Sequence, residues 1–293
     1  MKIKQSMGEK LFDVSNLILL SLLSIAAMVP LLHVLAGSFS SNNALIQSRV
    51  FLWPVEFTLS QFNYVIQTDS FWKAGWMTVK VVCIATFLNM VVTIVGSYPL
   101  SKLYLRGRKA IMLFIVFTMI FQAPLIPVYL VVKELHLINT LWALVIPGAI
   151  SAFNMILCIT FFRNLPEELF DAAKVDGMSD YRIVWEIVVP LSKPIMMTLL
   201  LFYAVGHWNN YFAPLLYIND RNLQTLQMYL YFLIAAGTSN DVASAASGDV
   251  GGKLLPEALE MATIVLATIP IVIIYPFLQK HFVKGATLGS IKE

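Results

Sequence analysis

Six long apolar segments constrain the fold of this chain more than any other feature of its sequence. Each has 21 to 26 residues, and together they make up a little under half of the 293 residues: 14–36, 75–100, 110–132, 140–162, 195–217 and 259–279. A helix needs about 20 mostly apolar residues to cross the hydrocarbon core of a bilayer. The segments therefore predict an all-α integral membrane protein with six transmembrane helices.

The composition also excludes an ordinary soluble enzyme. Hydrophobic residues make up 58% of the chain and charged residues only 13%, whereas soluble domains are about 25% charged. The first apolar segment resembles a signal peptide, but its apolar core is longer than the roughly 7–15 residues of a signal sequence. We interpret it as a retained helix that follows a cytoplasmic N-terminus, residues 1–13, and opens a single transmembrane domain, residues 14–293.

Lysine and arginine residues indicate how the chain crosses the membrane. With the N-terminus inside, 14 of the 20 basic residues fall on cytoplasmic pieces and 5 on outer pieces, while Lys80 lies within the second apolar segment. Cytoplasmic loops carry an excess of basic residues, so both termini are expected in the cytoplasm. The longest outer connection is 218–258, and its part 238–253, rich in small residues, is expected to be a loop. The net charge of +3 gives no indication of nucleic-acid binding.

The third cytoplasmic piece, called the 163–194 loop below, is predicted to be a helix–turn–helix. Pro166 suits the first turn of a helix, and Gly177 can take the left-handed conformation that ends one. Ser179 is expected to cap a second short helix, which stops at Pro190. The loop is therefore expected to lie as two short helices on the cytoplasmic face.

Several residues of the 163–194 loop are too apolar for a simple connection between two spans. We expect them to be exposed: Leu169, Phe170, Ala172, Ala173, Val175 and Met178. One interpretation is a docking element, in which the alanines permit close approach of a soluble partner. The other is an amphipathic pair of helices that rests on the lipid headgroups. The residues alone leave both interpretations open.

The loop carries a recognisable motif. The pattern Asp171-Ala-Ala-x-x-Asp-Gly177, then nine residues, then Ile187-x-x-Pro190, resembles the EAA loop of permease subunits of bacterial ABC importers. That family has Glu-Ala-Ala-x-x-x-Gly, nine residues, then Ile-x-Leu-Pro. Asp171 replaces Glu and Val189 replaces Leu, and both changes keep the character of the family residue.

Two further stretches resemble the carbohydrate-uptake class of these permeases. They are Trp208-Asn-Asn-Tyr-Phe-Ala-Pro214 and the C-terminal stretch 275–292. The likeness thus runs from the second apolar segment to the C-terminus. Among maltose-type permeases, the chain looks most like the second subunit of systems that import larger oligosaccharides, including uronate oligomers such as alginate.

The resemblance implies a type I ABC importer permease in the bacterial inner membrane, with the 163–194 loop as its coupling loop. The chain would be non-catalytic. Its implied partners are a second permease subunit in a heterodimer, a dimer of ATP-binding subunits and an extracytoplasmic substrate-binding protein. The residues that the resemblance places against the ATPase are Glu167, Glu168, Phe170, Asp171, Ala172, Ala173, Asp176, Gly177 and Met178.

The chain itself is expected to bind no cofactor, because ATP and magnesium belong to the partner ATPase. The nearest approach to a phosphate-binding loop, Gly251-Gly-Lys-Leu254, lacks the first glycine and the terminal hydroxyl residue that bind phosphate and magnesium. No cluster of His, Cys, Asp or Glu has the spacing of a metal site.

Polar and aromatic residues within spans are candidates for the translocation path, because they are costly to bury in lipid. Most of the candidates fall in the fifth apolar segment: Tyr203, His207, Trp208, Asn209, Asn210, Tyr211, and also Lys80 in the second. The alternative is that they hydrogen-bond between helices or form an interfacial aromatic belt. Lys80 either extends to the outer headgroups or, with His207, offsets the carboxylates of an acidic cargo.

Other classes of transporter fit the sequence less well. A secondary transporter needs ion-binding or protonatable groups near mid-membrane, and only His207 lies deep enough. An ABC permease for a non-sugar solute is the nearer alternative, and the C-terminal stretch disfavours it.

Overall fold

The computed structural model describes residues 7–121, 123–238 and 256–288, and in these residues it contains helices and no strand. The chain divides into two compact units. Unit 1 comprises Met1–Phe71 and Leu230–Ile269, and unit 2 comprises Trp72–Tyr229 and Pro270–Glu293. The predicted all-α fold is confirmed, whereas the single domain predicted from the sequence stays a prediction.

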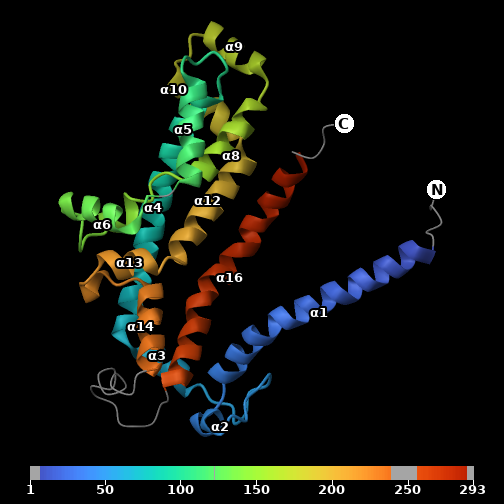
Figure 1. Cartoon of the computed structure of the whole chain (residues 1–293), viewed down its shortest axis with the longest axis vertical. Helices are drawn as coiled ribbons and strands as arrows, with labels where there is room; N and C mark the ends of the chain where they lie inside the picture. The colour runs from blue at the N-terminus through green and yellow to red at the C-terminus, as the bar shows by residue number, and fades with distance from the viewer. Residues whose placement is uncertain (1–6, 122, 239–255, 289–293) are drawn as a thin grey trace. The chain divides into compact units, whose positions relative to one another are not determined.

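The helices are short as well as long, and Figure 1 labels most of them. In chain order they are α1 (Met7–Ser38), α2 (Asn42–Ile46), α3 (Ser60–Gln67), α4 (Asp69–Ser101), α5 (Arg108–Ile120), α6 (Leu125–Glu134), α7 (Trp142–Val145), α8 (Ala152–Arg163), α9 (Glu167–Val175), α10 (Asp180–Arg182), the π-helix η1 (Ile183–Val188), α11 (Val189–Leu191), α12 (Lys193–Trp208), α13 (Phe212–Tyr217), the 3₁₀ turn η2 (Arg221–Leu223), α14 (Leu226–Thr238) and α16 (Pro256–Leu288).

In unit 1, the end of α1 packs tightly against the start of α16. A small buried cluster joins them to α2 and the residues after it: Ala36, Ala44, Leu45, Val50, Ala258 and Met261. A Cβ atom added to Gly37 would overlap the Met261 sulfur, so the two helices approach this closely because position 37 has no side chain. His33, three residues before Ala36, shares a hydrogen bond of 2.9 Å between its Nδ1 and the Phe51 carbonyl oxygen.

In unit 2, polar side chains of α4 form hydrogen bonds with several other segments. Its buried polar residues Thr78, Asn89, Thr93 and Ser97 recur at intervals of four or eleven residues, which keeps them near one face of the helix. Thr78 Oγ1 accepts a hydrogen bond of 2.7 Å from the Leu226 amide. Asn89 and Ser97 donate to carbonyl oxygens before and within α8, at 2.6 and 3.3 Å. A single polar face of α4 therefore satisfies backbone groups of several other segments.

Three helices are long and apolar enough to cross a membrane: α1, α4 and the described part of α16, Pro256–Ile274. The other three predicted segments are not continuous helices. α5 and α6 bend by 111°, α7 and α8 are separated by Pro147 and Gly148, and α12 ends at Trp208. Proline supplies no amide hydrogen for a helical bond, and Pro124 stands at the start of α6. These segments are broken or bent in the described residues, and the count of six crossings stays a prediction.

The helix α14 is absent from our sequence prediction, which treated 218–258 as an outer connection. It has 13 residues, so it is about 20 Å long and falls short of the roughly 20 apolar residues used to recognise a span. The apolar run of α14 is therefore too short to be recognised as a membrane span from the sequence. Most of the predicted loop 238–253 lies outside the described residues.

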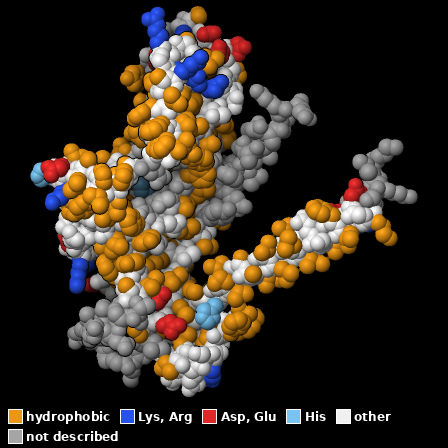
Figure 2. All heavy atoms as spheres, viewed as in Figure 1, with side chains coloured by type: hydrophobic (Ala, Val, Ile, Leu, Met, Phe, Trp, Pro, Cys, Tyr) orange, Lys and Arg blue, Asp and Glu red, His pale blue; other side chains and the backbone are white. Residues whose placement is uncertain are grey.

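The surface of unit 2 separates apolar from charged side chains. On the view in Figure 2, apolar side chains cover much of the α5 flank, while charged side chains gather near α9. Leu113 and Phe114 of α5 are both largely exposed. Such a band of exposed apolar side chains is what a lipid-facing surface needs.

Candidate functional site

The first helix of the 163–194 loop forms as its sequence predicts. α9 begins at Glu167, directly after Pro166, and carries Glu167 and Glu168 in its first turn and Lys174 in its last. Acidic residues near the N-terminus and a basic residue near the C-terminus both complement the helix dipole.

Gly177 ends α9 in a left-handed conformation, which confirms the predicted turn. Its φ angle is +76°. The Met178 amide donates to the Ala173 carbonyl oxygen at 2.9 Å, and the Gly177 amide donates to that of Lys174 at 3.0 Å. These two bonds define a Schellman motif, which needs a residue that tolerates positive φ.

The second helix of the loop differs from the prediction. Ser179 stands at the N-cap position, but its side chain makes no capping hydrogen bond. The helix also continues beyond Pro190 to Leu191, through the π-helix η1. Pro190 cannot donate to the carbonyl oxygen one turn earlier, and the wider π turn directly before it is one way that a helix accommodates such a residue. The break comes at Ser192, where the chain bends by 88° into α12.

The expected exposed apolar surface is wrong for two of its residues. Phe170 and Ala173 are each only 4% exposed, because positions three apart share one face of α9 and this face packs against Tyr98, Phe162 and Ile183. Met178 is partly buried against the same cluster. Val175 is 88% exposed. The exposed residues of α9 and of the turn after it include four acidic residues and one basic residue: Glu167, Glu168, Leu169, Asp171, Ala172, Lys174, Val175, Asp176 and Gly177.

Lys102 is a site residue that sequence reasoning missed. It follows the last residue of α4, is 8% exposed, and places its Nζ 3.0 Å from the centre of the Phe170 ring. It lines a polar cavity of about 90 Å³ together with Arg163 and Glu167. Burial lowers the pKa of Lys102, while the nearby Glu167 carboxylate acts in the opposite direction. The sequence presented Lys102 only as one of many cytoplasmic basic residues.

At the other predicted site, Tyr203 and His207 of α12 bond to α4. The Tyr203 hydroxyl lies 2.7 Å from Thr93 Oγ1, and His207 Nε2 lies 3.1 Å from Asn89 Oδ1. Asn89 also donates to the Gly148 carbonyl oxygen. In this chain, the two residues thus use polar atoms to join helices, which is the alternative that the sequence left open.

The remaining polar residues of the fifth segment form the break after α12. Asn209 is the C-cap of α12, and Asn210 Oδ1 accepts a hydrogen bond of 3.1 Å from the Ala213 amide near the start of α13. The exposed Tyr211 ring meets the Phe212 ring edge-on, with centroids 6.4 Å apart. The stretch from Trp208 to Pro214 therefore contains the end of α12, a three-residue break and the start of α13.

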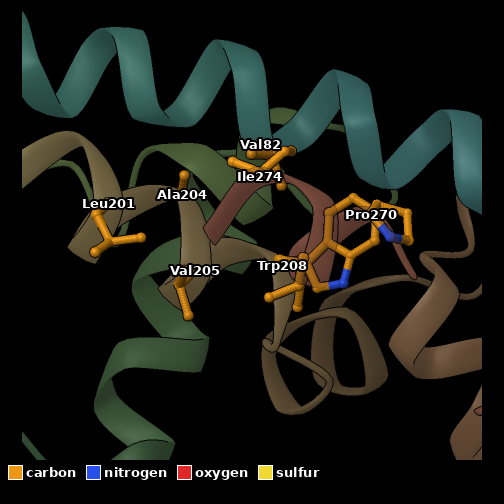
Figure 3. Close-up of a pocket in the computed structure, with 8 residues that line it drawn as sticks. Val82, Leu201, Ala204, Val205, Trp208, Pro270 and Ile274 are labelled. Atoms are coloured by element: carbon orange, nitrogen blue, oxygen red, sulfur yellow. The ribbon is translucent and has the colours of Figure 1, made fainter. Parts of the chain in front are cut away.

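Trp208 lies in an apolar cavity of about 60 Å³ between α4, α12 and α16. Figure 3 shows its indole beside Pro270, with Val82 and Ile274 nearby. The Trp208 Nε1 atom is buried and makes no hydrogen bond in the described part of the chain. Apart from the indole nitrogen of Trp208, the side chains that line this cavity are apolar.

Lys80 is not brought together with His207. Its side chain is exposed, and its Nζ lies 5.9 Å from the centre of the Trp76 ring. Lys80 and Asn89 are nine positions apart, which at 3.6 residues per turn places them on opposite faces of α4. Because His207 bonds to Asn89, the two basic residues point to different sides. Among the described residues, no group of three or more His, Cys, Asp or Glu side chains could hold a metal ion.

The model of a known protein family matches residues 84–287 of this sequence. That family is the binding-protein-dependent transport system inner membrane component. The chain belongs to this family. The match includes α9, the polar face of α4 from Thr86 onward, and the whole of α12, so the arrangement described above lies in the part of the permease that defines the family.

Relatives of the permease match along almost its full length. The protein LplC of Bacillus subtilis (strain 168) is 40% identical over 97% of this chain and 95% of its own. The polygalacturonan/rhamnogalacturonan transport system permease protein YtcP of the same organism is 39% identical over 98% of this chain and 100% of its own.

A solved structure shows the same fold. It is a crystal structure of a bacterial ABC transporter involved in the import of the acidic polysaccharide alginate. Its matching chain is 30% identical, with a TM-score of 0.87 over 96% of this chain and 100% of that chain. The protein described here is therefore a non-enzymatic permease of type I importer fold, an inner-membrane component of a binding-protein-dependent transporter.

Proposed function

We propose that this permease forms half of the translocation path of an ATP-driven importer for acidic oligosaccharides. The observation that carries the proposal is that two matches over nearly the whole chain, YtcP and the alginate transporter, are named for acidic polymers. Import of a neutral or non-sugar solute is the alternative, and a secondary transporter is disfavoured by the family.

The proposed assembly contains this permease, a second permease subunit, a dimer of ATP-binding subunits and an extracytoplasmic binding protein. ATP and magnesium bind to the ATPase. The basic residues of the sequence support an orientation with both termini in the cytoplasm. The broken segments α5–α6, α7–α8 and α12–α13 then complete the predicted six crossings together with α1, α4 and α16.

We infer that α9 docks on the ATPase through its exposed acidic side. Burial of Phe170 and Ala173 in the permease anchors the helix, so a push on Glu167, Glu168 or Asp171 would move the packed cluster beneath it. Small movements of one packed element can switch a two-state assembly. The short α9 would thus couple ATP binding to the opening of the path.

For the path itself, the turn after α12 offers the more accessible groups. Asn209 and Tyr211 are exposed in this chain, so they can present an amide and an aromatic ring to a sugar. Tyr203 and His207 would act on the path indirectly, by holding α12 against α4. In this proposal the predicted cluster belongs to the path, but only Asn209 and Tyr211 contact the sugar directly.

Uptake by cells that lack the permease gene would test the proposed cargo. Deletion should abolish uptake of labelled uronate oligomers, and a plasmid copy should restore it, while neutral maltotriose uptake stays unchanged in both. Unchanged uronate uptake after deletion, or loss of maltotriose uptake alone, would contradict the proposal. A Gly177→Asp copy that supports normal uptake would contradict the role of α9.

A further inference from the structure

We propose that Lys102 is the positioning residue that links α9 to α4, by holding its ammonium group against the ring of Phe170. The proposal rests on the proposed function of α9 as the helix that docks on the ATPase. Lys102 contacts neither the cargo nor ATP in this scheme. It would transmit displacement of α9 to the long helix that bonds the rest of unit 2.

Two aromatic rings, one from each helix, face the buried ammonium group. The Lys102 Nζ lies 3.0 Å from the centre of the Phe170 ring of α9 and 5.4 Å from the centre of the Tyr98 ring of α4. The two rings are 6.3 Å apart and inclined by 54°. A cation over an aromatic face is attracted by the ring quadrupole, and more strongly where water is excluded. The contact exists only while α9 lies against α4.

The charged groups around Lys102 come from three helices. α9 contributes Glu167, Asp171 and Lys174, and α10 contributes Asp180. Arg163 at the end of α8 lines the same cavity. Burial lowers the pKa of Lys102 and the three acidic groups oppose that shift, so among the described residues the groups that stabilise the ammonium charge lie on α9 and α10 and in the two rings. Release of α9 would remove most of this compensation at once.

The same helix, α4, also carries the polar residues that bond to α12. Tyr98 lies one turn before Lys102, and Thr93 and Asn89 follow on the same helix with their bonds to Tyr203 and His207 of α12. A rigid helix that is tied at one end to α9 and along its length to α12 is a contiguous physical route between the two predicted sites. Such a route requires a direct test of coupling, because contiguity alone does not demonstrate it.

The chain provides a matched control at the same place. Lys174 of α9 lies with its Nζ 5.2 Å from the centre of the Tyr104 ring, in the connection between α4 and α5. This pair also joins α9 to the end of α4, but Tyr104 is 70% exposed. Exposed cation–ring pairs are weak, so removal of Lys174 should have little effect.

Hydrogen exchange tests the link without any cargo. In the complete transporter complex purified from native cells, Lys102→Met should speed amide exchange in α9 roughly tenfold, the size expected for loss of a partly desolvated cation–ring contact. Lys102→Arg should restore wild-type exchange, and Lys174→Met should stay within about twofold of it. Equal effects of Lys102→Met and Lys174→Met, or wild-type exchange in Lys102→Met, would overturn the proposal.

ATP hydrolysis by the same complexes tests transmission. Stimulation by the loaded binding protein should fall roughly tenfold in Lys102→Met and recover in Lys102→Arg. Phe170→Leu keeps an apolar side chain but removes the ring, and should behave as Lys102→Met does, with no further loss in the double variant. Additive losses would overturn the link. If wild-type hydrolysis responds to no oligosaccharide, the proposed cargo fails, and the exchange result still decides whether Lys102 holds α9.

Discussion

The two regions singled out by the sequence, α9 and the polar end of α12, use their side chains in opposite ways. α9 buries the apolar Phe170 and Ala173 within the permease and leaves its carboxylates on the surface. α12 buries the hydroxyl of Tyr203 and directs the ring of His207 to Asn89, so that polar atoms form its contact with α4. One region therefore exposes its charges, while the other uses its polar atoms within the permease.

This difference teaches how polar residues should be interpreted in a membrane protein. Outside the bilayer, an exposed carboxylate is inexpensive and remains available for binding. Inside it, a polar atom needs a partner from the same bundle, and helix–helix hydrogen bonds commonly supply one. A polar side chain in a span is thus weaker evidence of a transport path than one at a helix break, such as Asn209.

The largest expected effect comes from breaking the turn that presents the acidic side of α9. Gly177→Val places a β-branched residue at φ +76°, a conformation that costs ordinary L-residues about 1–2 kcal/mol. Among the described residues other than its two chain neighbours, no heavy atom lies within 4 Å of the added Cβ position, so the expected cost comes from the backbone conformation. We expect uptake to fall roughly fivefold to thirtyfold, since each 1.4 kcal/mol is about a factor of ten.

Gly177→Asn is the matched control, because asparagine tolerates the left-handed conformation. It should retain more of the wild-type uptake than Gly177→Val does, because asparagine adopts the left-handed region as a single residue. Membrane insertion of both variants should match wild type by fractionation. Equal loss in both variants would show that the side chain at position 177 matters to a partner more than the turn does.

The second-largest effect is expected from loss of the hydrogen bonds that Asn89 of α4 makes. Asn89→Leu removes both a donor to the Gly148 carbonyl oxygen and an acceptor for His207. Both hydrogen bonds are partly buried, and a polar group left unpaired away from water costs about 1–3 kcal/mol, so the unfolding midpoint of the purified complex should fall by several degrees. Transport per folded complex should stay near wild type if Asn89 only joins helices. A normal midpoint with lost transport would instead place Asn89 in the path.

Much of the local structure could be predicted from the sequence, because it depends on neighbouring residues. The acidic first turn of α9 and the left-handed Gly177 follow from helix-end chemistry over a few positions. The all-α fold follows equally from apolar segments longer than a soluble helix needs. These predictions required no knowledge of which helices meet.

Which side chains contact one another across helices could not be predicted in the same way. Phe170 is buried because α9 folds back on Tyr98, and the sequence does not state that contact. Lys102 resembles any other basic residue at the end of a span until Phe170 is placed over it. The helix breaks near Pro124 and Pro147 were visible as prolines, but proline within a membrane helix is compatible with either a bend or a straight packed helix.

A smaller effect is expected from the second bond between α4 and α12. Tyr203→Phe keeps the buried ring and removes the hydroxyl that pairs with Thr93. Side-chain hydrogen bonds between membrane helices average about 0.6 kcal/mol and reach about 1.7, so the unfolding midpoint should fall less than for Asn89→Leu. Thr93→Val should give the same shift, and the double variant should add little, since both remove one bond. Additive shifts would show that the two groups have separate partners.

The smallest effect is expected at Lys80. Its substitution tests whether an exposed charge on α4 matters as much as the hydrogen bonds between α4 and α12. Lys80 is exposed beside Trp76 and lies on the face of α4 opposite Asn89. Lys80→Gln should therefore change uptake of uronate oligomers by less than about fivefold, because an exposed cation–ring pair contributes only about 0.5–1 kcal/mol. His207→Gln, in contrast, alters the bond to Asn89 and should lower the unfolding midpoint. Selective slowing of acidic over neutral oligosaccharides by Lys80→Gln in proteoliposomes would contradict this assignment and would place Lys80 in the translocation path after all.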